Sequence, residues 1–218
     1  MKLAIFDVDG TLSDSQAHII ASVTYGFTEV GLPVPERGRI LSIVGLSLPE
    51  AMAQLAPEAT AAQRAGVVEA YKASYNLQRL AQPAPLYPGA VETLDRLAGR
   101  ADMLLGIATG KSRRGLDALC AHHGIGGYFC TRQVADDHPS KPHPAMIGAA
   151  LREAGVEPGA VVMIGDTTYD IEMGRAAGVA TIGVGWGYHP GADLRAAGAG
   201  VIVEDFAALE RAVQEILA

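Results

Sequence analysis

The stretch FDVDGT at residues 6–11 decides the fold, because it ends a short apolar run, Lys2–Val8, that is typical of a buried strand. Asp7 and Asp9 are two residues apart, so their side chains point the same way from an extended strand. Two carboxylates this close repel each other, and burial strengthens the repulsion. Gly10 permits a tight turn directly after them. The stretch therefore predicts a positively charged partner at the end of the first strand.

Five more short apolar segments follow, and stretches with helical spacing separate most of them. Several of these segments are apolar at nearly every position, which is typical of parallel strands covered on both faces. The alternation predicts an α/β fold with a doubly wound, mostly parallel sheet and a Rossmann-like core. The expected strands are Met103–Ala108, Tyr128–Thr131, Ala160–Ile164, Ala180–Val184 and Gly200–Val203. The expected helices are Ala90–Leu97, Arg113–His123, Ala145–Ala154, Asp170–Ala177 and Ala207–Leu217.

One long region, between the first strand and Pro88, contains no convincing strand. Apolar residues recur at helical spacing in Ile19–Val30, in Leu48–Leu55 and across residues 67–75. This region therefore predicts an all-helical insert in the α/β core.

The boundaries of the insert follow from local composition. Ser13 and Gln16 fit a capping box that opens its first helix. Its far end is proline-rich, which suits a stiff hinge. We expect a helical cap at residues 15–82 and a catalytic core at residues 1–14 and 83–218.

Composition limits the classes of partner. The chain has 218 residues, 49% of them apolar and 19% charged, so a sizeable core can form. A net charge of −7 argues against a nucleic-acid partner, although a local positive site can still bind a small anion. Cys120 and Cys130 match neither a redox pair nor a zinc site. No apolar run approaches the ~20 residues that span a bilayer, and no signal peptide is recognisable, so we expect a cytoplasmic protein without membrane contact.

Polar residues follow three other predicted strands. The segment IATGK ends the second strand with Thr109, Gly110 and Lys111, and the hydroxyl and backbone N–H groups there could hold phosphate oxygens at a helix N-terminus. The loop SKPHP contributes Lys141, and VVMIGDTTYD contributes Asp166 and Asp170. Because ligands bind at the carboxyl ends of the strands in open α/β sheets, we expect these side chains to lie together.

Four carboxylates at one edge of a sheet could not all ionise without compensation. A hard divalent cation with oxygen ligands would supply it, and magnesium suits a partly hydrated carboxylate site. Lys141 would add a second positive charge. The sequence therefore predicts a magnesium site beside Asp7 and Asp9.

Four segments together resemble the signature motifs of the haloacid dehalogenase superfamily. They are DVDGTLSDS, ATGK, KPHP and GDTTYDIEMGRAAG, they occur in that superfamily's order, and they span residues 7–178. The whole chain resembles the phosphoglycolate-phosphatase-like branch, which carries a helical cap inserted after the first motif. The resemblance implies a phosphatase that acts on a small phosphorylated metabolite, as a monomer or a homodimer.

The resemblance also implies a role for each motif residue. Asp7 would be the nucleophile that forms an aspartyl-phosphate. Asp9 would keep its side chain free to protonate the leaving oxygen and then to activate water. The groups implied for metal binding are Asp7, the backbone carbonyl of Asp9, Asp166 and, directly or through water, Asp170. The groups implied for binding the phosphoryl group are Gly10, Thr109, Gly110 and Lys141, of which Thr109 and Lys141 would also assist catalysis.

Other activities of the superfamily, and other functions, remain open alternatives. A dehalogenase would lack Asp9. A β-phosphoglucomutase-like enzyme is a runner-up, but Leu48 stands where that branch has a phosphate-binding arginine. Outside enzymes, the chain could be a phosphorylation-switched signalling module or a phosphate-binding module. For the phosphatase, we expect the loop around Val44–Leu48, with Arg37 and Arg39 nearby, to select the substrate.

Overall fold

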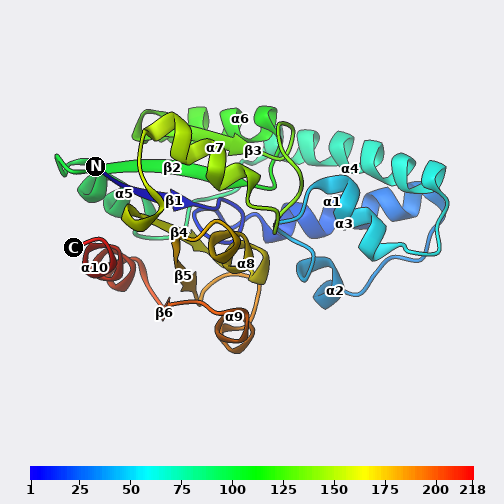
Figure 1. The fold of residues 1–218 in the computed structure, drawn as a ribbon. Helices are drawn as coiled ribbons and strands as arrows, with labels where there is room; N and C mark the ends of the chain where they lie inside the picture. Colours follow the sequence, from blue (N-terminus) through cyan, green and yellow to red (C-terminus); the bar gives the residue numbers. More distant parts are fainter.

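The computed structural model describes all residues from 1 to 218, and its core is a six-stranded sheet in which every neighbouring pair is parallel (Figure 1). The strand order is β3-β2-β1-β4-β5-β6, which confirms the predicted doubly wound α/β fold. The strands are β1 (Lys2–Phe6), β2 (Met103–Thr109), β3 (Phe129–Val134), β4 (Val161–Gly165), β5 (Ala180–Val184) and β6 (Val201–Val203).

Helices cover both faces of the sheet, as near-continuous apolar strands require. One face buries side chains such as Phe6 and Ile107 against α5 (Ala90–Ala98), α6 (Arg113–His123) and α10 (Phe206–Ile216). The other face buries Leu3 and Ile5 against α7 (Ala145–Ala154) and α8 (Thr168–Ala176). The remaining core elements are α9 (Gly191–Ala197) and two short 3₁₀ turns, Gly126–Tyr128 and Pro158–Ala160.

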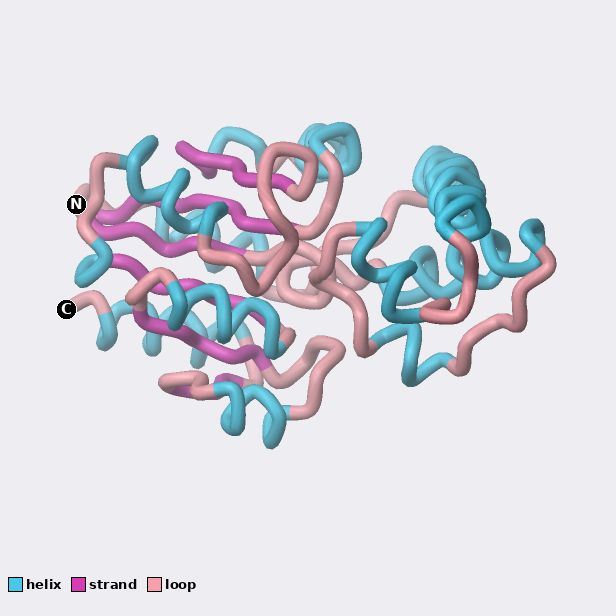
Figure 2. The backbone as a smooth tube through the Cα atoms, turned by 45° about the vertical axis from the view of Figure 1, so that its right-hand side comes forward, coloured by secondary structure: helices cyan, strands magenta, loops and turns pink.

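Four helices follow β1 and precede α5, and they lie beyond the carboxyl ends of the strands (Figure 2). They are α1 (Gln16–Val30), α2 (Arg37–Leu41), α3 (Leu48–Leu55) and α4 (Ala61–Ala81). They share an apolar cluster separate from the two clusters of the sheet. In this cluster α1 presents three buried residues spaced four apart, Ile19, Val23 and Phe27. They pack with Val67 and Val68 of α4. None of the helices has both the length and the apolar character needed to cross a membrane.

The predicted capping box of Ser13 and Gln16 is wrong. The N-cap residue of α1 is Ser15, and no side chain caps the helix. The hydroxyl of Ser13 instead donates to the carbonyl of Pro85 at 3.1 Å. Ser13 thus joins the two chain segments that connect the sheet to the helical insert.

The strand order positions the polar residues of the motifs. Strand β1 pairs with β2 on one side and with β4 on the other. The chain therefore adds strands first on one side of β1 and then on the other. The carboxyl end of β1 is therefore the topological switch point, where doubly wound sheets bind ligands. Asp7 follows β1, Thr109 ends β2 and Asp166 follows β4, so the chain brings all three to this point.

Candidate active site

Asp7 lies at the centre of the switch point and is 1% exposed. Its Oδ1 accepts a hydrogen bond from the Lys141 ammonium at 2.8 Å, and the same ammonium contacts Asp170 Oδ1 at 2.5 Å. Burial raises the pKa of Asp7 from 3.8 to about 7, while the charge of Lys141 acts in the opposite direction. Burial also disfavours the charged form of Lys141, but Asp170 and Asp7 more than offset it, so the pKa of Lys141 is raised. The predicted positive partner of Asp7 is therefore Lys141.

Three carboxylates converge beside this ion pair. Oxygen atoms of Asp7, Asp166 and Asp170 lie within 4.8 Å of one another, and all three residues are buried. Asp166 accepts hydrogen bonds from the Thr11 hydroxyl at 2.8 Å and from the Tyr188 N–H at 2.9 Å. Burial, and then the charges of Asp170 and Asp7, raise the pKa of Asp166 well above its ordinary value. When its three carboxylates are ionised, the cluster thus holds more negative charge than Lys141 alone neutralises.

The residues of the cluster fit a divalent cation. Asp7 Oδ2 is buried and has no hydrogen-bond partner. A buried carboxylate oxygen without a partner is costly, and a cation with oxygen ligands would satisfy it. The side chain of Asp9 lies outside the cluster, and its predicted contribution to the metal through the backbone carbonyl stays a prediction.

Asp170 is held by the start of its own helix. Its Oδ2 accepts from the Thr167 N–H at 3.0 Å and from the Thr167 hydroxyl at 2.7 Å, as part of a capping box at the N-terminus of α8. With Oδ1 on Lys141, both oxygens of Asp170 already have partners. Asp170 therefore fixes Lys141 in the site whether or not it also contacts a metal.

Gly10 supplies the turn that the sequence predicts. Its φ of 89° is in the left-handed region, where side chains are unfavourable. Its backbone also packs against the carboxylate of Asp166, so closely that a Cβ at Gly10 would overlap that group. The turn after β1 therefore requires glycine for two independent reasons.

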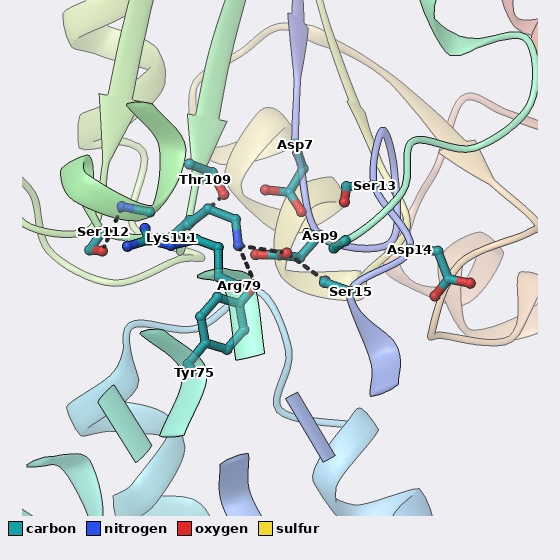
Figure 3. Close-up of polar contacts among 12 residues, drawn as sticks. Asp7, Asp9, Ser13, Asp14, Ser15, Tyr75, Arg79, Thr109, Lys111 and Ser112 are labelled. Atoms are coloured by element: carbon teal, nitrogen blue, oxygen red, sulfur yellow. Dashed lines mark hydrogen bonds and ion pairs between the residues drawn. The ribbon is translucent and has the colours of Figure 1, made fainter. Parts of the chain in front are cut away.

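Asp9 has partners that the sequence does not predict, while its role as the proton carrier stays a prediction. Its Oδ1 receives the Lys111 ammonium at 2.9 Å and the Ser15 hydroxyl at 2.5 Å (Figure 3). The Lys111 ammonium also contacts the Tyr75 hydroxyl at 2.9 Å, and lies 4.9 Å from the centre of the Tyr75 ring. Burial disfavours the charge of Lys111, but Asp9 and then Tyr75 more than offset it, so its pKa is raised. The Lys111 ammonium thus contacts two oxygen atoms inside the site, one from Asp9 and one from Tyr75.

A cavity of about 430 Å³ connects these groups with the helical insert. Asp7, Asp9, Thr109 and Gly110 line its end at the sheet, and apolar side chains of α1, α3 and α4 line its other end. Thr109 is buried, and its hydroxyl accepts from the backbone N–H of Lys111 at 3.2 Å. The basic residues of the cavity wall are Lys72, Arg79, Lys111 and Arg114. The cavity therefore offers a negatively charged ligand several cations besides the buried Lys141.

The loop between α2 and α3 lines one side of the cavity, and its expected role in selecting the substrate stays a prediction. Gly45 and Leu46 bring their carbonyl oxygens against Gly110, and the Ser47 N–H donates to the Ser140 hydroxyl at 2.8 Å. Arg37 and Arg39, however, do not line the cavity. Arg37 bonds to Gln16, and Arg39 donates to the Gln54 carbonyl. These two arginines secure helices of the insert, so their expected role in selecting substrate is wrong.

Sequence reasoning missed the partners that come from distant elements. Tyr75 was visible only as part of a helical apolar pattern, and Tyr188 only as a residue following β5. Ser15 was visible only as a residue near the start of a helix. No local signal marks these contacts, because they depend on how α4 and the loop after β5 pack around Asp9 and Asp166.

Comparison with known proteins gives consistent results. The family profile described as haloacid dehalogenase-like hydrolase matches residues 4–184. A protein of Dickeya dadantii named "Probable phosphatase IndB" is 36% identical over 219 residues, covering 99% of this chain and 94% of that protein. A phosphoglycolate phosphatase of Haemophilus influenzae is 30% identical over 217 residues, covering 95% and 96%. The crystal structure of a hydrolase from Pseudomonas syringae has a TM-score of 0.89 at 25% identity, with 100% of both chains covered.

Proposed function

Because the chain belongs to the haloacid dehalogenase-like hydrolase family and is a phosphatase, we propose that it hydrolyses small phosphomonoesters with magnesium, through an aspartyl-phosphate on Asp7. The observation that carries the proposal is Asp7 itself. It is a buried carboxylate at the switch point, with Oδ1 held by Lys141 and Oδ2 without a partner. Lys141 thus holds this carboxylate in one orientation at the edge of the sheet where a phosphoryl group would bind, as a nucleophile requires.

The proposed reaction has two displacements. In the first, Asp7 attacks phosphorus, the ester P–O bond breaks, and Asp9 gives a proton to the departing oxygen. In the second, Asp9 takes a proton from water, which attacks the same phosphorus and releases orthophosphate and the free Asp7 carboxylate. The Thr109 hydroxyl and the Gly110 N–H would bind oxygens of the phosphoryl group, and Lys141 would balance its charge.

The proposed magnesium site consists of Asp7, Asp166 and the backbone carbonyl of Asp9, with Asp170 supporting it. When bound, the ion would neutralise the carboxylates and the charge on the transferring phosphoryl group. The unpartnered Asp7 oxygen and the convergence of three buried carboxylates support this assignment.

We propose residues 15–82 as a cap over a core formed by residues 1–14 and 83–218. The cap would exclude water from the phosphoryl group and would contact the leaving group. A small organic phosphate such as phosphoglycolate is the substrate class suggested by the name of the Haemophilus influenzae relative. Leu48, an apolar residue in the cavity wall, offers no charge to a second phosphate, which favours hydrolysis over phosphomutase activity.

The test is hydrolysis of p-nitrophenyl phosphate and of a panel of phosphate esters, with magnesium and with a chelator. We expect turnover that requires magnesium and that Asp7→Asn abolishes, while the free energy of unfolding stays close to that of the wild type. Asp14→Asn is the matched control, because Asp14 lies in the same loop but is exposed. Magnesium-dependent hydrolysis by the Asp7→Asn variant would exclude Asp7 as the nucleophile.

A further inference from the structure

Lys111 connects the helical insert to Asp9 across the cavity. It follows Thr109 and Gly110 at the end of β2, and its side chain is 7% exposed. The ammonium reaches Asp9 Oδ1 on one side and the Tyr75 hydroxyl on the other, each at 2.9 Å. Figure 3 shows dashed lines from the Lys111 ammonium to the Asp9 carboxylate and to the hydroxyl of Tyr75, which belongs to α4. This contact exists only while α4 lies over the carboxyl end of the sheet.

Tyr75 is itself held firmly in this position. Its ring stacks on Tyr71, one helical turn earlier, with ring centres 5.7 Å apart. His18 of α1 meets the same ring edge-on at 6.0 Å. The hydroxyl therefore projects towards Lys111 from a ring that is already fixed by two neighbours in the insert.

The contacts on Asp9 are asymmetric. Lys111 and Ser15 both bind Oδ1, and no group of the protein binds Oδ2. A carboxylate held through one oxygen has its rotation restricted and its second oxygen directed to a defined point. Asp9 also lines the cavity, so Oδ2 is the atom available to a leaving group or a water there.

We propose that Lys111 and Tyr75 are positioning residues for Asp9, and that their contact makes proton transfer depend on the helical insert covering the site. The inference rests on the proposed phosphatase reaction and adds two residues to it. Tyr75 holds the ammonium of Lys111 on Asp9 Oδ1, and this leaves Oδ2 oriented for the leaving oxygen. Neither residue contacts the reacting atoms.

The test compares esters that need a general acid to different degrees. p-Nitrophenyl phosphate releases a stable phenolate and needs little protonation, whereas ethyl phosphate releases a poor leaving group. In Tyr75→Phe and Lys111→Met we expect kcat/KM for ethyl phosphate to fall about 10–100-fold, and that for p-nitrophenyl phosphate to fall less than about 3-fold. Because the two residues act as one unit, the double variant should lose no more than about 3-fold beyond the worse single variant.

Tyr128→Phe is the control for removing a tyrosine hydroxyl, because Tyr128 bonds to Asp95 on the core and is remote from the cavity. Phosphoglycolate serves as a third probe, since it adds a carboxylate to an ester of similar size. A loss confined to phosphoglycolate would mean that Lys111 binds the substrate carboxylate, and would overturn the inference. Equal losses on ethyl and p-nitrophenyl phosphate, or additive losses, would also overturn it. A wild-type protein that hydrolyses none of the three esters would contradict the proposed function itself.

Discussion

At the scale of single residues, Gly10 joins the backbone of the first loop to the carboxylate cluster. Its left-handed φ and its contact with Asp166 are two separate demands. In Gly10→Ala the backbone strain alone is worth about 1–2 kcal/mol. The added Cβ would also displace the Asp166 carboxylate, so we expect a larger loss of stability and magnesium-dependent activity reduced more than about 100-fold.

Gly31→Ala separates the two effects. Gly31 has a φ of 72° at the end of α1, and a Cβ there would meet no atom within 4 Å. We expect this variant to lose only about 1–2 kcal/mol, with activity unchanged. Chemical denaturation measures the free energy of unfolding of both variants, and steady-state kinetics measures their activity. Similar behaviour of the two would mean that the packing of Gly10 on Asp166 has no functional consequence.

Some residues of the site could be predicted from the local sequence, and others could not. Asp7, Lys141 and Asp166 could be predicted because each directly follows a strand or lies in a characteristic loop, and parallel strands bring such ends together. The partners of Asp9 could not be predicted. Tyr75 is far from Lys111 in the sequence, and only the packing of α4 on α1 directs its hydroxyl towards the core.

At the scale of elements, the loop between α2 and α3 meets the start of α6 at a place without room for a side chain. A Cβ on Gly110 would lie 2.5 Å from the Gly45 carbonyl oxygen and 2.8 Å from the Leu46 carbonyl oxygen. In Gly110→Ala we expect kcat/KM to fall at least about 10-fold, because the loop must move outward and admit water. The backbone N–H of residue 110 is retained, so phosphate binding through it is not removed.

The free energy of unfolding of Gly110→Ala should fall by about 1–3 kcal/mol, because the added Cβ meets the backbone of the loop and the loop must shift to accommodate it. Gly127→Ala is the control in another loop of the core, where a Cβ would meet nothing within 4 Å. Wild-type kcat/KM in Gly110→Ala would mean that the close approach of the loop is not needed for catalysis.

The elements themselves were largely predictable, and the exceptions have physical reasons. The helices Arg113–His123 and Ala145–Ala154 are observed with the predicted bounds, because each has a strong apolar face and a glycine at its end. The short helices α2 and α9 were missed, because each buries a single residue and so has no detectable period. The capping box failed because Ser13 pairs with chain from the far side of the insert, a contact that sequence spacing does not reveal.

At the scale of the whole molecule, the carboxylate cluster couples stability to pH and to magnesium. Burial raises the pKa of Asp7 to about 7, and raises that of Asp166 as well. An acid with a higher pKa in the folded state keeps its proton after the unfolded chain has lost it. Where the ionisation of these two groups dominates the pH dependence, the free energy of unfolding therefore falls as the pH rises from the unfolded pKa near 3.8 towards 7. In the metal-free protein this contribution is most favourable at acidic pH.

Magnesium should reverse this loss, because it binds the ionised carboxylates and competes with protons. We expect magnesium to raise the melting temperature more at about pH 8 than at about pH 5, since Asp7, with its pKa raised to about 7, is mostly ionised at the higher pH and protonated at the lower. Thermal unfolding with magnesium chloride, and with sodium chloride at equal ionic strength, separates site binding from screening. Asp7→Asn should reduce both the magnesium effect and its pH dependence, because it removes one ionisable group from the cluster. An equal gain at the two pH values would mean that magnesium binds elsewhere, and that the buried carboxylates are balanced by Lys141 alone.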